Sequence, residues 1–251
     1  MRRLSELTFD ALTAGWTIAQ RRKGHRHSTD DLLTGWYALE IVRAPARILD
    51  LGAGIGSVGL IALWRSPPET TLVAIEAQEV SYALLVDNVE RNRLADRVRT
   101  IHGDLREVRL DDRFDLVTGS PPYWDVSEGV MPADSQKAHA RFELRGDVRD
   151  YALAARAVLA AHGRFVFCFP TVQRARAEAA VVAADLAVIR SRDVIPRAGA
   201  APLFTLFACR RLEDGSEPHV READHVVRDQ TGEPTAMHRT ARATLGFTSP
   251  G

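Results

Sequence analysis

The stretch Asp50-Leu-Gly-Ala-Gly-Ile-Gly56 ends an apolar run, Ala46–Leu51, and leads into a helix-like segment that starts near Gly59. Its three glycines let the backbone turn tightly and approach a ligand without a clash from a Cβ atom. A strand that passes through a glycine-rich turn into a helix is typical of open α/β sheets, which bind ligands at the carboxyl edge of their strands. The sequence therefore predicts a ligand site at this turn.

The rest of the chain alternates short apolar runs with helix-like stretches. Expected strands are 46–51, 71–75, 98–102, 114–118, 164–169, 188–194 and 203–209, and expected helices are 59–65, 78–93, 147–161 and 175–186. This alternation predicts an α/β fold, doubly wound, with a mostly parallel seven-stranded sheet and helices on both faces. We expect one domain over 1–251, comprising an N-terminal extension (1–45), a catalytic sheet core (46–211) and a polar C-terminal segment (212–251) with a short helix at 235–244.

The composition is that of an ordinary soluble globular protein. Of 251 residues, 45% are hydrophobic and 26% charged, which excludes collagen-like, low-complexity and wholly disordered chains. Basic and acidic side chains number 33 each, which excludes a polybasic binder but allows a nucleic-acid enzyme with a local basic face. Cys168 and Cys209 end apolar runs without Cys/His ligand spacing, so we expect buried thiols and no metal. No signal sequence and no apolar run of ~18 residues is present, so we expect a cytoplasmic protein without a membrane partner.

Acidic residues follow the next two expected strands and distinguish between possible nucleotide ligands. Glu76 ends the second strand, where a carboxylate accepts hydrogen bonds from ribose hydroxyls, and Asp104 follows the third, where it can accept from an adenine amine. The dinucleotide pattern Gly-x-Gly-x-x-Gly would need glycine at position 57, which is Ser57. Asp50 instead suits the amino group of an amino-acid moiety, which S-adenosylmethionine has and a dinucleotide lacks. The sequence thus favours S-adenosylmethionine.

A second motif, Ser120-Pro-Pro-Tyr-Trp124, follows the fourth expected strand. Two prolines fix the backbone and remove two N–H donors, which leaves carbonyl groups available. The Ser120 hydroxyl and the Pro121 carbonyl can each accept one N–H of a conjugated amine and so direct its lone pair toward a methyl donor. Tyr123 offers a face for stacking a planar base, and Trp124 either flanks that base or packs in the loop wall. We predict Ser120, Pro121, Pro122 and Tyr123 as the catalytic motif.

Together these residues resemble the class I methyltransferases that use S-adenosylmethionine, in the subgroup that acts on exocyclic or amide nitrogen. Three outer segments, His27–Leu33, Ala138–Glu143 and Val226–Asp229, are similar to those of the bacterial tRNA adenine-N6 methyltransferases. This resemblance runs over nearly the whole chain. It implies methylation of the adenine just 3′ of the anticodon in a valine tRNA. Cofactor contacts are then expected from Thr29, Asp30, Asp50, Gly52, Gly54, Gly56, Glu76, Asp104 and Ser120.

The chain departs from that family at one position of the proline motif. The family normally carries asparagine where this sequence has Ser120. Serine is usual there in related DNA cytosine-N4 methyltransferases, so an amine target still fits while the identity of the base stays open.

Basic residues near both motifs suggest how a neutral protein can hold tRNA or another structured RNA. Residues 21–27 form a concentrated basic stretch, which is either a solvated face or a phosphate-contacting arm. Thr29 or Asp30 either caps a helix or, by the resemblance, lies beside the cofactor. The predicted RNA contacts are Arg21, Arg22, Lys23, Arg26, Trp124, Arg141, Arg145 and Arg197. Two alternatives remain open: methylation of a protein glutamine amide, and a cofactor- or RNA-binding module without activity.

Overall fold

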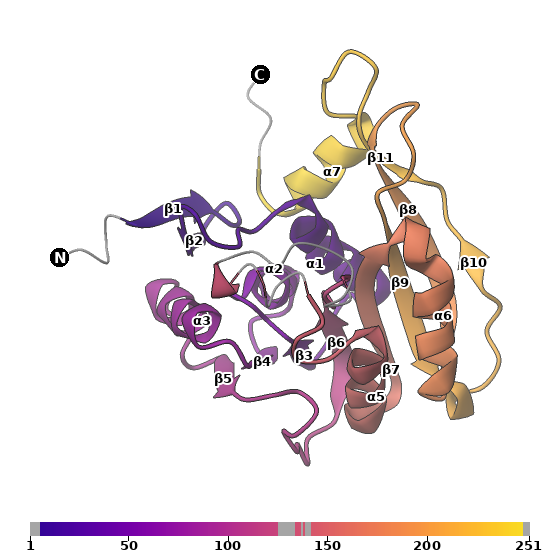
Figure 1. The fold of residues 1–251 in the computed structure, drawn as a ribbon, viewed down its shortest axis with the longest axis horizontal. Coiled ribbons are helices and arrows are strands. Elements are labelled where there is room, and N and C mark those ends of the chain that lie inside the picture. Colours follow the sequence, from indigo (N-terminus) through magenta and orange to yellow (C-terminus); the bar gives the residue numbers. More distant parts are fainter. Residues whose placement is uncertain (1–5, 125–133, 137, 139–141, 248–251) are drawn as a thin grey trace.

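The computed structural model describes residues 6–124, 134–136, 138 and 142–247. Its main sheet has the strand order β10-β8-β9-β7-β6-β3-β4-β5, and β11 also pairs with β8 (Figure 1). The strands are β3 (Arg47–Leu51), β4 (Thr71–Glu76), β5 (Val98–His102), β6 (Phe114–Gly119), β7 (Leu159–Pro170), β8 (Leu186–Arg197), β9 (Phe204–Arg211), β10 (Val220–Arg221) and β11 (His225–Arg228). The predicted doubly wound sheet of seven strands is confirmed, with β10 and β11 added at the β8 edge.

The order of the strands decides where a ligand can enter. β3 pairs in parallel with β4 on one side and with β6 on the other, so the chain winds outward from β3 in both directions. Only β9 among the seven core strands runs antiparallel to its neighbours, β7 and β8. A crevice is expected at the carboxyl ends of β3 and β6, because the two crossover connections leave the sheet on opposite faces there.

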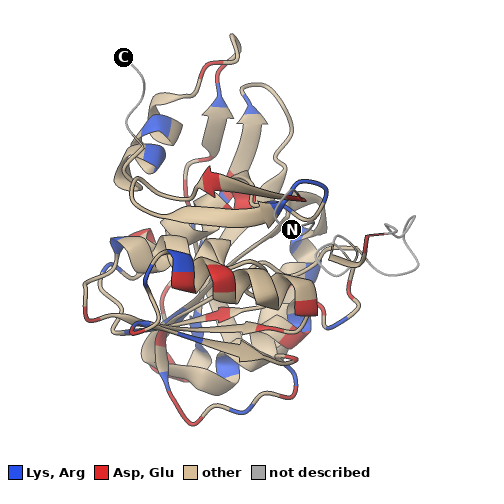
Figure 2. Cartoon of the chain, turned by 90° about the vertical axis from the view of Figure 1, so that its left-hand side faces the viewer, with Lys and Arg blue, Asp and Glu red and all other residues tan. Residues whose placement is uncertain are grey.

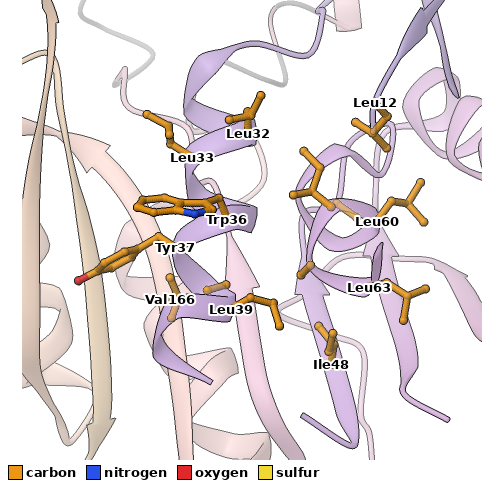
Figure 3. Packing of buried hydrophobic residues seen from close by; sticks show 14 of the residues in the cluster. Leu12, Leu32, Leu33, Trp36, Tyr37, Leu39, Ile48, Leu60, Leu63 and Val166 are labelled. Atoms are coloured by element: carbon orange, nitrogen blue, oxygen red, sulfur yellow. The ribbon is translucent and has the colours of Figure 1, made fainter. Parts of the chain in front are cut away.

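Helices cover both faces of the sheet. α1 (Thr29–Ile41), α2 (Ser57–Arg65), α3 (Glu79–Arg91) and α7 (Ala236–Thr244) contribute to one apolar cluster, and α5 (Val148–Val158) and α6 (Arg174–Ala183) contribute to the other. Successive strand residues point to opposite faces, so Ile48 joins the first cluster and Leu49 the second. Figure 3 shows Leu33, Trp36 and Leu39 of α1 gathered with Val166 of β7. Burying each side chain of this size contributes ~1.5–3 kcal/mol to folding.

The structure corrects the prediction of a helix over the alanine-rich segment 147–161, which is not helical throughout. α5 ends at Val158, and β7 already begins at Leu159, which pairs with Phe114 of β6. The pairing shifts register between Phe114 and Leu116, and His162 adopts a φ of 60°. Sheet pairing therefore overrides the helix propensity of the alanines in this segment.

The structure adds an element that the sequence analysis did not assign. β1 (Leu7–Ala11) and β2 (Thr17–Arg21) form an antiparallel hairpin. Two asparagines, one in α3 and one that caps its end, hold it: the amide N–H of Ala19 donates to Asn88 Oδ1 at 2.6 Å, and that of Thr17 donates to Asn92 Oδ1 at 2.9 Å. The N-terminal extension is thereby attached to the core near the carboxyl edge of the sheet.

The C-terminal segment ends in α7 as predicted, with Thr235 as its cap. Within the described ranges, no helix is both long and apolar enough to cross a bilayer. Figure 2 shows acidic and basic residues interspersed over the visible face, in keeping with the zero net charge.

Candidate cofactor and acceptor site

The glycine turn after β3 forms one wall of a pocket at the carboxyl edge. Gly52 and Gly54 have φ values of 58° and 57°, in the left-handed region that favours glycine. A Cβ at Gly52 would lie 1.9 Å from the hydroxyl oxygen of Tyr151, so no larger residue fits there without displacing that ring. A Cβ at Gly54 would meet no atom within 4 Å, because the space above it belongs to the pocket. The turn thus leaves room for a ligand against its backbone.

Asp50 lies beneath this turn and is buried. Its Oδ2 accepts from the Gly59 amide at 2.9 Å, and its Oδ1 accepts from the Thr118 hydroxyl at 2.7 Å. The carboxylate therefore ties β3 to α2 and β6, a structural role beyond the predicted ligand contact. Burial raises its pKa to about 6, against the hydrogen bonds from Thr118 and Gly59, which lower it. Asp50 still lines the pocket.

Glu76 reaches the same pocket from the end of β4. Its two carboxylate oxygens accept from the amides of Gly54, at 2.7 Å, and Gln78, at 2.6 Å. The side chain bridges the glycine turn and the start of α3. Burial raises its pKa despite these two hydrogen bonds. Glu76 therefore lies beside the glycine turn, and its contact with a ribose remains a prediction.

The first turn of α1 brings two further carboxylates into the pocket. The helix begins at Thr29, and the amide of Ser28 donates to Asp31 Oδ2 at 3.2 Å. The cap is therefore Ser28, which corrects the expectation that Thr29 or Asp30 caps the helix. Asp30 and Asp31 line the pocket, whereas Thr29 is exposed and outside the lining. Burial and the neighbouring Asp30 charge hold the pKa of Asp31 well above its usual range.

The charges of this pocket suit the predicted cofactor. Four carboxylates line it, and His25 and Arg145 are the basic side chains among its described lining residues. S-adenosylmethionine carries a sulfonium and an ammonium group, and an opposite charge nearby stabilises each cation. Its ribose hydroxyls can donate to Glu76, and the space over Gly54 accepts a ligand close to the backbone. The residues therefore fit S-adenosylmethionine.

Asp104 is placed differently from its predicted role. Both of its carboxylate oxygens accept from Arg106, with N···O distances of 2.9 and 2.6 Å. Its neighbours Gly103 and Leu105 line the pocket, while Asp104 itself does not. The segment predicted to hold the adenine is at the pocket, but the structure does not bring the Asp104 side chain into it.

The proline motif contributes Ser120, Pro122 and Tyr123 to the lining of the same pocket. Ser120 lines the pocket, and its Oγ lies 3.4 Å from Sγ of Cys168, a buried residue of β7. Pro121 and Pro122 are buried. The Tyr123 ring contacts Phe169 edge-on, with centroids 6.1 Å apart. Burial and the nearby Asp30 raise the pKa of Tyr123, so its hydroxyl stays protonated. The Ser120 hydroxyl and the Tyr123 side chain thus border the same cavity as the cofactor residues, whereas Pro121 is not among the lining residues.

The predicted RNA-binding residues are not all equally available. Arg21 pairs with Asp134 at 2.9 Å and Arg26 pairs with Asp10 at 3.0 Å, so these two charges are partly neutralised within the chain. Arg22 and Lys23 are exposed. The remaining predicted residues fall into three groups: Arg145 lines the pocket, Trp124 and Arg197 are exposed, and Arg141 lies outside the described residues.

Several pocket residues were absent from the sequence prediction. Tyr151 comes from α5, beyond the long connection, and packs under the glycine turn. Asp31 follows the predicted Asp30 directly. The spacing Ser28-x-x-Asp31 is typical of a capping box, so the sequence could have predicted its hydrogen bond with the Ser28 amide. Ser57 and Gln136 also line the pocket. Within the described ranges, no cluster of three or more His, Cys, Asp or Glu side chains could hold a metal ion.

A sequence model of the methyltransferase small domain matches residues 37–145. The chain is 30% identical over 187 residues to the tRNA1(Val) (adenine(37)-N6)-methyltransferase of Bacteroides thetaiotaomicron, which covers 74% of this chain and 77% of that protein. The chain belongs to the tRNA1(Val) (adenine(37)-N6)-methyltransferase family. A family member from Histophilus somni is 26% identical over 225 residues, which cover 89% of this chain and 91% of that protein.

The fold agrees with this family. A crystal structure of a predicted O-methyltransferase from Agrobacterium tumefaciens has a TM-score of 0.62 at 15% identity, covering 86% of this chain and 97% of that one. The predicted class I methyltransferase fold is thereby confirmed. The chain is an S-adenosylmethionine-dependent methyltransferase, and the carboxylate-lined pocket is the part of the fold that suits this cofactor.

Proposed function

We propose that the protein transfers a methyl group from S-adenosylmethionine to the N6 amine of an adenine in tRNA. The position is the one in the names of its relatives, adenine 37 of a valine tRNA. The observation that carries the proposal is that Ser120 and Tyr123 line the same pocket as Glu76 and the glycine turn. An acceptor oxygen and a stacking face there border the space that suits the cofactor.

The chemistry follows from the nature of the target. An adenine amine is conjugated with its ring, so its lone pair is a poor nucleophile until the nitrogen becomes tetrahedral. The Ser120 hydroxyl and the Pro121 carbonyl each accept one N–H, which favours the tetrahedral form and turns the lone pair toward the pocket. When bound, S-adenosylmethionine supplies a methyl group on a sulfonium, which is an activated leaving group. The protein contributes positioning and polarisation rather than a strong base.

Tyr123 has the second role in this mechanism. Its ring lines the pocket next to Ser120, so a target base can lie against it with the amine directed at Ser120. A base within a helical stack cannot reach this position, so the adenine has to be presented unstacked. Stacking on an aromatic side chain contributes ~1–3 kcal/mol per base, which offsets part of the cost of unstacking.

Further parts of the proposal rest on the sequence. We propose that the described elements act as one methyltransferase domain in the cytoplasm. The alternatives, a glutamine amide as acceptor or a module without activity, use the same pocket. The Ser120 hydroxyl favours an acceptor that has N–H groups to donate, and the intact motif favours transfer over binding alone.

Tritiated methyl transfer tests the proposal. The protein is incubated with labelled S-adenosylmethionine and either bulk tRNA, total RNA or a protein extract, followed by mass spectrometry of the nucleosides. We expect N6-methyladenosine in tRNA, and none in a valine tRNA transcript that carries guanine in place of adenine 37. Label in protein glutamine alone would support the rival acceptor, and label in no fraction would contradict activity.

A further inference from the structure

Three exposed apolar side chains stand at the carboxyl edge beside the acceptor wall. Trp124 is 46% exposed, Val172 is 90% exposed and Leu203 is 61% exposed. Trp124 follows β6, Val172 lies in the short helix η2 (Thr171–Gln173) after β7, and Leu203 directly precedes β9. Because β9 runs antiparallel to β7, its first residue lies at the same edge as the last residue of β7.

Hydrogen bonds join these three segments into one continuous surface. The Gln173 side chain donates to the backbone oxygen of Tyr123 at 3.0 Å, which ties η2 to the proline motif. The Thr171 amide donates to the backbone oxygen of Leu203 at 3.3 Å, which ties η2 to the start of β9. The apolar side chains therefore continue the wall that Tyr123 begins.

Two arginines extend this surface where β8 projects beyond the start of β9. The last pairing between these strands is Val194 with Phe204, and β8 continues to Arg197 paired with β11 alone. Arg197 and Arg228 are register partners at that end. Both guanidinium groups lie against the turn at Gly232: Arg228 Nη1 donates to the Gly232 oxygen at 2.7 Å, and Arg197 Nη2 lies 3.4 Å from where a Cβ of Gly232 would stand. No carboxylate of the described ranges forms an ion pair with either.

We infer that Trp124, Val172, Leu203, Arg197 and Arg228 form an acceptor rim that binds the nucleotides flanking the target base in a single-stranded RNA loop. The inference rests on the proposed function and names the surface that would hold the substrate outside the pocket. Unstacked bases present flat apolar faces that suit the exposed side chains. Their phosphates suit guanidinium groups that lack a carboxylate partner. An RNA loop supplies both kinds of contact at once.

The chain contains a matched control for the apolar part of the rim. Val182 and Leu212 are 68% and 49% exposed and lie together at the opposite edge of the sheet. Asp185 joins them, because its amide donates to the Val182 oxygen and its oxygen accepts from the Leu212 amide, both at 3.1 Å. The test pair is Val172→Ser with Leu203→Ser, and the control pair is Val182→Ser with Leu212→Ser.

Steady-state kinetics of tRNA methylation then measure how much the apolar part of the acceptor rim contributes to tRNA binding. We expect the test pair to raise KM for tRNA by at least about fivefold, because two aliphatic side chains no longer cover the base faces. Its kcat and its affinity for S-adenosylmethionine are expected to stay unchanged, and the control pair is expected to match the unaltered protein. Equal KM values for the test and control pairs would overturn the inference. A raised KM for a protein acceptor instead of tRNA would also overturn it, by assigning the rim to a peptide.

The arginines are tested by salt dependence. Each lost phosphate contact is expected to reduce the slope of log affinity against log salt by about 0.7 for single-stranded RNA. We expect Arg197→Gln with Arg228→Gln to reduce this slope, and Arg43→Gln with Arg113→Gln, exposed at the other edge, to leave it unchanged. An unchanged slope in the first pair would remove the arginines from the rim. The activity of the unaltered protein distinguishes the proposed function from the acceptor rim. If the unaltered protein does not methylate tRNA, the proposed function itself is contradicted.

Discussion

The Tyr123 hydroxyl donates a hydrogen bond to Oδ2 of Asp30 at 3.1 Å, which joins the end of β6 to the first turn of α1. The same tyrosine is held on two other sides, by Phe169 against its ring and by Gln173 at its backbone oxygen. Its ring orientation is therefore fixed by contacts from three elements before a base arrives.

Two substitutions of Tyr123 separate the stacking of the target base from the positioning of the tyrosine ring. Tyr123→Ala removes the ring and is expected to lower kcat/KM for tRNA by roughly five- to 150-fold, the loss of ~1–3 kcal/mol of stacking. Tyr123→Phe keeps the ring and loses only the hydrogen bond to Asp30, so we expect a smaller loss, mainly in kcat. If Tyr123→Phe lowered kcat/KM as much as Tyr123→Ala, the ring would not be the stacking surface. Calorimetric S-adenosylmethionine affinity serves as the control for both variants.

Ser120 is expected to act on the transition state. Its hydroxyl accepts from the amine as the nitrogen becomes tetrahedral, so Ser120→Ala should lower kcat while KM and cofactor affinity change little. Ser120→Asn restores the residue usual in the family and is expected to keep or raise formation of N6-methyladenosine in tRNA. Mass spectrometry of digested tRNA measures both variants. Loss of activity in Ser120→Asn on a different acceptor, with no gain on adenine, would mean that serine is matched to another target.

Cofactor affinity is expected to depend on pH through the buried carboxylates. The pKa of Asp50 is raised to about 6, so the group becomes neutral below that pH and attracts a cationic ligand less. Affinity for S-adenosylmethionine should therefore fall by about tenfold between pH 7 and pH 5 through this group alone. Calorimetry across this range measures the effect. Asp50→Asn should bind more weakly at pH 7 with a shallower pH dependence, whereas Asp50→Ala also loses the contacts with Gly59 and Thr118. An equally steep profile in Asp50→Asn would exclude Asp50 as the titrating group.

The exposed part of the N-terminal basic stretch is expected to contact phosphates. Arg22→Glu with Lys23→Glu should weaken tRNA binding and reduce its salt dependence, without affecting S-adenosylmethionine. Arg21 is left unchanged because its loss would also break the ion pair with Asp134. The control is Arg43→Glu with Arg113→Glu, which makes the same charge change at the opposite edge of the sheet. Binding of tRNA is titrated over a range of salt concentrations. If the test and control pairs have the same affinity at each concentration, residues 22 and 23 form only a solvated face.

A buried histidine pair makes the attachment of α7 sensitive to acid. His225 Nε2 lies 3.1 Å from His238 Nδ1, and burial lowers the pKa of His225 to about 4. Because this value lies below the ordinary 6.5, the stabilising contribution is complete above pH 6.5 and is lost as pH falls toward 4. The loss is on the order of 3 kcal/mol. Urea unfolding at pH 7 and pH 4.5 should show a smaller drop for His225→Gln than for the unaltered protein, and equal drops would contradict the assignment.

Local sequence patterns predicted the sheet core because each strand there is an apolar run bounded by turn residues. They also predicted Asp50, Glu76 and Ser120 near one edge of the sheet, since all three lie at or just past the carboxyl ends of parallel strands. The β1–β2 hairpin was missed because asparagine side chains in α3 and at its end, some seventy positions away, hold its backbone. Tyr151 was missed for the same reason: its helical pattern does not reveal that its hydroxyl lies under Gly52.

Ion pairing within the chain also could not be predicted from the sequence. The sequence shows that 21–27 is basic, but not that Asp134 and Asp10 neutralise two of its arginines. Contacts with S-adenosylmethionine, including that predicted for Asp104, stay predictions, as does the division of the chain into extension, core and tail.

The adjacency of Asp30 and Asp31 has a thermodynamic consequence. One residue of this helical turn holds the ring on which the base stacks, and the next faces the cavity that suits the methionine end of the cofactor. A ligand that rigidifies the turn from one side lowers the entropy cost for a ligand on the other. Such coupling is reciprocal, so the cofactor should raise the affinity for tRNA by the same factor by which tRNA raises the affinity for the cofactor. The demethylated cofactor, which keeps the same amino and carboxylate groups, should then also slow the release of methylated tRNA.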